Sequence, residues 1–126
     1  MNKEMELRFQ VEYQSGVAVV HCAGRMVRGT PLEEFRRQVE QFEQARILIV
    51  DLSEVEQIDA GGLGTLLLIR RWSRQYSVQM KLVDPSPFVL RLLEATHLTS
   101  VFEISSLEEA LCILQALGER PRYAVA

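Results

Sequence analysis

The sequence lacks several features that mark particular classes of protein. Only two cysteines are present, Cys22 and Cys112, and they lie far apart without C-x-x-C spacing. We expect both to be small buried apolar residues in a reducing, cytoplasmic setting. No segment approaches the roughly 20 apolar residues that span a bilayer, and residues 1–8 show no signal-peptide pattern. Direct insertion into a membrane is therefore not expected.

An excess of basic residues is also absent. The chain has 14 lysines and arginines against 17 aspartates and glutamates, which gives a net charge of −3. This balance argues against a nucleic-acid-binding protein, which normally presents a basic face. The composition is otherwise average, with 48% apolar and 25% charged residues. A length of 126 residues fits a single domain, residues 1–126, with its own core.

The periodicity of apolar residues predicts the order of strands and helices. Residues 7–14 alternate as in a half-buried strand, and after the turn at Ser15-Gly16 the run Val17–Ala23 predicts its hairpin partner. Ile47–Val50 is apolar on both faces, as expected of a covered central strand. Further strands are predicted at 78–82 and 101–104, and helices from Thr30, over 61–76, from Ser86 and from Ser106.

This order predicts an α/β fold. We expect a largely parallel sheet of about five strands that opens with one antiparallel pair, with about four helices packed on it. Thr30-Pro31-Leu32-Glu33 and Ser106-Leu107-Glu108-Glu109 both have the pattern of a capping box at a helix start. Gly118 is expected to end the last helix, and residues 119–126 to form a loose tail beyond a core of about 6–117.

The segment after the central strand is the most informative. The strand is expected to end in a polar loop, in which Ile58 returns to the core just before Asp59. Asp59 can cap the following helix by accepting hydrogen bonds from its first amides. Ala60, Gly61 and Gly62 have almost no side chain, so another backbone or a phosphate can approach this helix start closely.

The glycines of this helix need an explanation, since each costs roughly 1 kcal/mol relative to alanine in a helix interior. Gly61, Gly62 and Gly64 either permit close packing of the helix on the sheet or leave room for a partner. Two apolar stripes follow, Leu63-Leu66-Leu67 and Leu68-Ile69-Trp72, and the second requires a neighbouring helix or a partner. Arg70, Arg71 and Arg74 are expected to form a solvated face that complements the helix dipole.

The stretch Leu48–Leu67 resembles the signature of the STAS domain family, in which a hydrophobic strand ends in Asp-Leu-Ser and leads to an Asp-Ser-Ser/Ala-Gly-Leu-Gly helix start. Residues 82–87, 98–102 and 108–111 are similar to the second half of that family. The resemblance covers roughly residues 6–117 and implies a mixed sheet with helices mainly on one face. It also implies a non-enzymatic regulator that binds an anti-sigma factor, itself a serine kinase, and so frees a sigma factor.

The sequence departs from the family at two positions. In the family, phosphorylation of the serine directly after the aspartate prevents binding, since a phosphate adds about −1.5 to −2 charges where the partner approaches. Here that position is Ala60, so the chain cannot be switched there. Val27 replaces the aspartate of the family's Gly-x-Leu-Asp pattern. The resemblance implies a partner-binding surface of Asp59, Ala60, Gly61, Gly62, Leu63, Arg25 and Val27.

Two functions follow from these departures. The chain either binds a serine-kinase anti-sigma factor at all times, or it acts outside a kinase circuit. In the second case it is a scaffold or a soluble subunit of a larger assembly, such as a stress-sensing complex or a transporter, with other STAS-domain proteins as partners. A homodimer is left open. Thr65 and Ser53 are weak candidates for a replacement phosphorylation site, because core or capping roles explain both.

Signs of catalysis are weak. Asp51, Glu54, Glu56 and Asp59 have no histidine or cysteine near them in sequence, and acidic residues between a strand and a helix are usually solvated. His21 and His97 have no evident nucleophile to activate. The run of residues 61–65 fits neither the dinucleotide fingerprint nor the P-loop. We therefore expect no catalytic residue, no metal and no cofactor.

Overall fold

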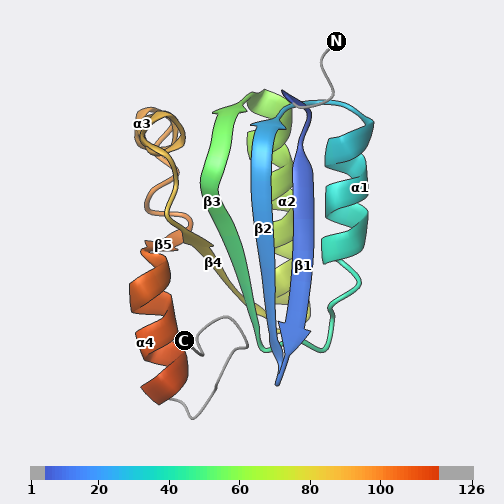
Figure 1. Ribbon diagram of the computed structural model, residues 1–126, viewed down its shortest axis with the longest axis vertical. Helices are drawn as coiled ribbons and strands as arrows, with labels where there is room; N and C mark the ends of the chain where they lie inside the picture. Colours follow the sequence, from blue (N-terminus) through green and yellow to red (C-terminus); the bar gives the residue numbers. More distant parts are fainter. Residues whose placement is uncertain (1–4, 117–126) are drawn as a thin grey trace.

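The computed structural model describes residues 5–116, which form a sheet of five strands and four helices (Figure 1). The strands are β1 (Arg8–Gln14), β2 (Val17–Met26), β3 (Ile47–Ile58), β4 (Gln79–Val83) and β5 (Glu103–Ser105). The helices are α1 (Thr30–Val39), α2 (Ala60–Gln75), α3 (Pro87–Ala95) and α4 (Leu107–Ala116). The elements follow one another in the predicted order.

The strands lie side by side in the order of the sequence, β1-β2-β3-β4-β5. β1 and β2 form an antiparallel hairpin, and each later strand pairs parallel with the one before it. Helices connect the parallel strands, as such crossovers require. The predicted mixed sheet with an opening hairpin is therefore confirmed.

Three helices cover one face of the sheet and the fourth lies on the other. Side chains from α1, α2 and α3, including Phe35, Leu66 and Val89, pack with Val20 and Leu48 in the larger core cluster. The smaller cluster joins strand residues of the opposite face to α4. It contains Val17, Val19, Ile47, Ile49, Val83 and Ala110. In Figure 1, α2 is seen behind the strands, α1 stands to the right of β1, and α4 lies apart from them at the lower left, next to β5. This agrees with the expectation of helices mainly on one face.

The two central strands are longer than the sequence analysis predicted. β2 continues through residues 24–26, and β3 continues through residues 51–58, both of which we expected to be loops. The two extensions pair with each other, and the register shifts between His21 and Ala23 and between Gly24 and Arg25. These irregularities break the alternation of period two. Leu52, Val55 and Ile58 are thus buried at a spacing of three, which hid the strand.

The predicted capping boxes have different outcomes. Thr30 is the first residue of α1, the preceding Gly29 is at the cap position, and no side chain caps this helix, so that prediction was wrong. Ser106 does cap α4, because its Oγ accepts a hydrogen bond from the amide of Glu109 at 3.0 Å and donates to the Glu109 carboxylate at 3.2 Å. Gly118 and the expected tail, residues 119–126, lie outside the described residues.

The two cysteines also differ from each other. Cys22 is buried as predicted, but Cys112 is exposed on α4, so the expectation of burial was wrong there. None of the helices within residues 5–116 is long and apolar enough to cross a membrane.

Candidate functional site

β2 and β3 end side by side, and the chain enters α2 directly after Asp59. This residue is the N-cap of α2, in an extended conformation, and its Oδ1 accepts a hydrogen bond from the Gly62 amide at 2.8 Å. Its other oxygen, Oδ2, accepts a hydrogen bond from the Arg28 amide at 3.2 Å. The predicted cap is confirmed, and the same carboxylate also joins the start of α2 to the loop that follows β2.

The surroundings of Asp59 favour its ionised form. Desolvation by burial acts to raise the pKa of this carboxyl, but hydrogen bonds from the amides of Gly62, Arg28 and Gly61, with the positive charge of Arg28, outweigh it. The pKa of Asp59 is therefore lowered from its ordinary value. The start of α2 thus has a fixed negative charge at neutral pH.

The three glycines of α2 have different surroundings. A Cβ on Gly62 would lie 2.0 Å from the Met26 carbonyl oxygen and 2.7 Å from Ile58 Cγ1, so only glycine lets the helix reach the sheet there. A Cβ on Gly61 would meet Asp59 Oδ1 at 3.1 Å, which is tight. A Cβ on Gly64 would meet nothing within 4 Å. Close packing therefore explains why glycine occupies position 62, and it contributes to the choice of glycine at position 61. It does not explain the glycine at position 64.

We call residues 59–63 the α2 tip. Asp59 and Ala60 are exposed, Gly61 and Leu63 are half-buried, and Gly62 is buried against β2. Within the described residues, the side of the tip formed by Asp59 and Ala60 is open to a partner, whereas the side formed by Gly62 is covered by the end of β2. This accessibility is what the sequence-based hypothesis requires.

The two other residues predicted for the binding surface, Val27 and Arg25, have different surroundings. Val27 is half-buried and directly precedes Arg28, whose amide bonds to Asp59. Arg25 lies within β2 rather than in a loop, and its Nε donates a hydrogen bond to the Met5 carbonyl at 3.3 Å. The segment before β1 therefore contacts the same end of the sheet.

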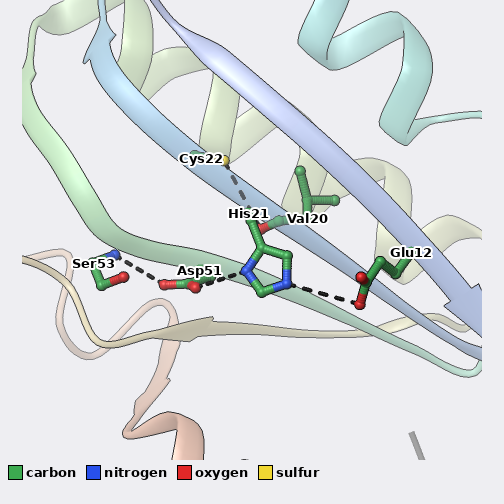
Figure 2. A network of polar contacts seen from close by, with 6 residues as sticks. All are labelled: Glu12, Val20, His21, Cys22, Asp51 and Ser53. Atoms are coloured by element: carbon green, nitrogen blue, oxygen red, sulfur yellow. Dashed lines mark hydrogen bonds and ion pairs between the residues drawn. The ribbon is translucent and has the colours of Figure 1, made fainter. Parts of the chain in front are cut away.

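Sequence reasoning missed a polar network on the sheet face that α1 to α3 leave uncovered (Figure 2). His21 on β2 lies opposite Asp51 on β3, and its Nδ1 is 2.9 Å from Asp51 Oδ2. The other oxygen of Asp51 accepts a hydrogen bond from the Ser53 amide at 3.0 Å, and His21 Nε2 lies 4.0 Å from Glu12 Oε2. Asp51 is buried, so this network satisfies a carboxylate that would otherwise be costly to bury.

Cys22, the next residue on β2, points into the core beneath the helices. Burial, together with the negative charge of Asp51, strongly raises the pKa of the Cys22 thiol. The reactive thiolate is therefore scarce at this position.

Among residues 5–116, no group of three or more histidine, cysteine or acidic side chains is arranged to hold a metal ion.

The fold and the tip define a class of domain, in which a mixed sheet presents a glycine-rich helix start beside a loop. The family model described as the STAS domain matches residues 8–110, and the chain belongs to this family. Its sequence is similar to that of an anti-sigma F factor antagonist from Paenibacillus polymyxa, with 27% identity over 103 residues, or 79% of this chain and 87% of the relative.

Solved structures support the same fold. The chain is similar to the anti-sigma factor antagonist SpoIIAA in its unphosphorylated form, with a TM-score of 0.73 and 20% identity, over 90% of this chain and 99% of that one. It is also similar to a sulfate transporter family protein from Wolinella succinogenes, with a TM-score of 0.67 and 15% identity, over 83% of this chain and 89% of that one. At such identities the likeness concerns the fold.

Proposed function

We propose that this STAS domain is an anti-sigma-factor antagonist that is always competent to bind, and that its partner is an anti-sigma factor of the serine-kinase type. The relative from Paenibacillus polymyxa is named an anti-sigma F factor antagonist, which supports an anti-sigma factor as the partner. The α2 tip, with Val27 and Arg25 beside it, is the proposed binding surface. The role is binding and not catalysis.

The observation that supports constant competence is the exposed methyl group of Ala60. In the resemblance described above, this position holds the serine whose phosphorylation prevents binding. A phosphate there would stand next to the ionised Asp59 and would occupy the surface that a partner must approach. Because Ala60 has no hydroxyl, that modification cannot occur, and the tip keeps its unmodified shape and charge.

A second candidate function is supported by the likeness to a sulfate transporter family protein. In this case the domain would be a scaffold or a subunit of a larger assembly and would bind other STAS-domain proteins. The two functions differ in the class of partner, so binding experiments separate them.

The test is to mix the purified chain with each serine-kinase-type anti-sigma factor of the source genome and to measure binding by calorimetry. We expect a complex with at least one of them, and we expect Ala60→Asp to weaken it by at least about tenfold through charge repulsion and bulk. The matched control is Ala95→Asp, at an exposed position at the end of α3, which should leave the affinity unchanged.

A further variant tests the assignment of the missing hydroxyl. With the kinase that binds, Ala60→Ser should accept phosphate and then lose affinity, as followed by mass spectrometry and calorimetry. The proposal fails if no such kinase binds, or if Ala60→Asp and Ala95→Asp bind equally well. Binding to other STAS-domain proteins alone would favour the second candidate function.

A further inference from the structure

The outward side of α2 has a stripe of exposed residues, with the half-buried Gly64 among them, that begins at the tip. Its residues are spaced three or four apart and so lie on one face of the helix. We call this set the α2 stripe, and it consists of Ala60, Gly64, Leu67, Leu68, Arg71 and Arg74. Leu67 is 37% exposed and Leu68 is 40% exposed, whereas Leu66, Ile69 and Trp72 on the opposite side are buried in the core. The predicted grouping of Leu66 with Leu67 and of Leu68 with Ile69 was therefore wrong.

The α2 stripe is positively charged on a chain whose net charge is −3. α2 contains three arginines and no acidic residue. Within the described part of the chain, Arg71 and Arg74 form no ion pair or hydrogen bond through their guanidinium groups. On α1, by contrast, Arg36 pairs with Glu40 at 2.9 Å and Arg37 pairs with Glu34. The positive charges of Arg71 and Arg74 are thus available to pair with acidic groups of another molecule.

Gly64 makes a notch in the middle of the stripe. A Cβ at this position would touch nothing, so neither the sheet nor a neighbouring helix requires glycine there. Glycine in a helix interior nevertheless costs roughly 1 kcal/mol relative to alanine. The notch lies beside Leu67 and Leu68, where an apolar side chain of a partner could enter.

We propose that the α2 stripe is the docking surface for an acidic amphipathic segment of the protein partner. This inference rests on the proposed function, since the partner that contacts the tip would extend along α2. Apolar residues of the segment would cover Leu67 and Leu68 and fill the notch at Gly64. Acidic residues of the segment would pair with Arg71 and Arg74.

The charges also bear on two other occupants. In a symmetric antiparallel pairing of two α2 helices, the acidic group that faces the arginines of the other copy is Asp59, and both of its oxygens already accept hydrogen bonds, from the amides of Gly62 and Arg28. An anionic membrane would attract the arginines, but the stripe offers only two exposed leucines for insertion, and the chain as a whole is negatively charged. An acidic amphipathic segment of a protein would both cover the exposed leucines and pair with the arginines.

The first test uses the anti-sigma factor that binds the chain. Arg71→Glu should weaken the complex by at least about tenfold, and the wild-type affinity should fall with added salt. The double change Leu67→Ser with Leu68→Ser should also weaken it. Arg91→Glu is the matched control, because Arg91 is exposed on α3 and undergoes the same change of charge. If Ala60→Asp weakens the complex but Arg71→Glu behaves like Arg91→Glu, the inference is overturned and the proposed function stands.

A second test does not depend on the anti-sigma factor. The probe is a synthetic amphipathic peptide of about 20 residues with leucines on one face and glutamates beside them, and the control peptide has lysine at each glutamate position. We expect the acidic peptide, and not the lysine peptide, to shift the amide resonances of residues 64–75, and Arg71→Glu to abolish the shifts. The inference is overturned if both peptides bind or if neither binds. It is also overturned if phosphatidylglycerol vesicles, tested as a third probe, bind the stripe and the acidic peptide does not. If no anti-sigma factor binds but the acidic peptide does, the docking surface stands without the proposed function.

Discussion

At the scale of single residues, Gly62 and Gly64 lie within three positions of the same helix but have opposite surroundings. Gly62→Ala would place a methyl group 2.0 Å from the Met26 carbonyl oxygen. We expect this change to lower the free energy of unfolding by about 1–3 kcal/mol, because backbone and sheet must move apart. Gly64→Ala meets open space and should raise that free energy by about 0.5–1 kcal/mol through helix propensity.

Urea denaturation of the two variants measures this contrast. Each variant is the control for the other, since both gain one methyl group in the same helix. Equal effects, or a loss of stability for Gly64→Ala, would contradict the surroundings described for the two glycines.

Asp59 gives a second prediction at this scale. Asp59→Ala removes the cap of α2 and should lower the free energy of unfolding by about 1 kcal/mol near neutral pH. Because folding lowers the pKa of Asp59, its ionised form is stabilising above the unfolded pKa of about 4, and this contribution disappears as the pH falls through the lower folded pKa. The difference between wild type and Asp59→Ala should therefore be smaller in acid than at neutral pH.

Chemical denaturation over a series of pH values measures this difference. Glu43→Ala, at an exposed position after α1, is the control and should give a small difference that does not narrow in the same way. A gap between wild type and Asp59→Ala that is constant or wider in acid would contradict the prediction.

At the scale of elements, the sequence was sufficient for the order of strands and helices but not for the length of the central strands. Alternation and capping patterns depend on neighbouring residues, so β1, α3 and the cap of α4 could be predicted locally. The extension of β3 could not, because residues 51–58 become a strand only by pairing with the irregular end of β2. Polar residues there resemble a loop until the partner strand is known.

The attachment of α3 shows a similar long-range effect. Ser86 precedes α3, but its Oγ donates a hydrogen bond to the Val55 carbonyl on β3 at 2.7 Å and does not cap its own helix. Ser86→Ala should lower the free energy of unfolding by about 1 kcal/mol, because a partly buried carbonyl loses its partner. Ser100→Ala is the control, since its Oγ makes only a 3.5 Å contact at an exposed site, and its effect should stay within about 0.5 kcal/mol. Thermal and urea unfolding measure both losses of stability. Equal losses for the two variants would contradict this role of Ser86.

At the scale of the whole molecule, the candidate site depends on contacts that the sequence does not reveal. Asp59 was predicted as a cap from its neighbours, but its bond to the Arg28 amide joins residues 31 positions apart. His21 and Asp51 are 30 positions apart and meet because β2 and β3 pair in parallel. Neither pair has a local pattern, so both could be found only with the register of the sheet.

The two cysteines report on the integrity of the whole fold. Cys112 is exposed and should react with a maleimide in the folded protein, whereas Cys22 is buried with a raised pKa and should react only when the molecule opens. Mass spectrometry should therefore find one label per folded chain and two in denaturant. Cys112→Ser is the control and should take up no label while folded. Rapid labelling of Cys22 in native buffer would contradict the burial described here.

The contact between Gly62 and the end of β2 also bears on the thermodynamics of the association that we propose. Since the backbone of α2 at Gly62 packs directly against Met26 and Ile58, the first turn of the helix has little room to move in the free protein. A binding surface that is already rigid loses little conformational entropy when a complex forms. If the α2 tip is the binding surface that we propose, variants that loosen this contact should bind with a larger entropic penalty.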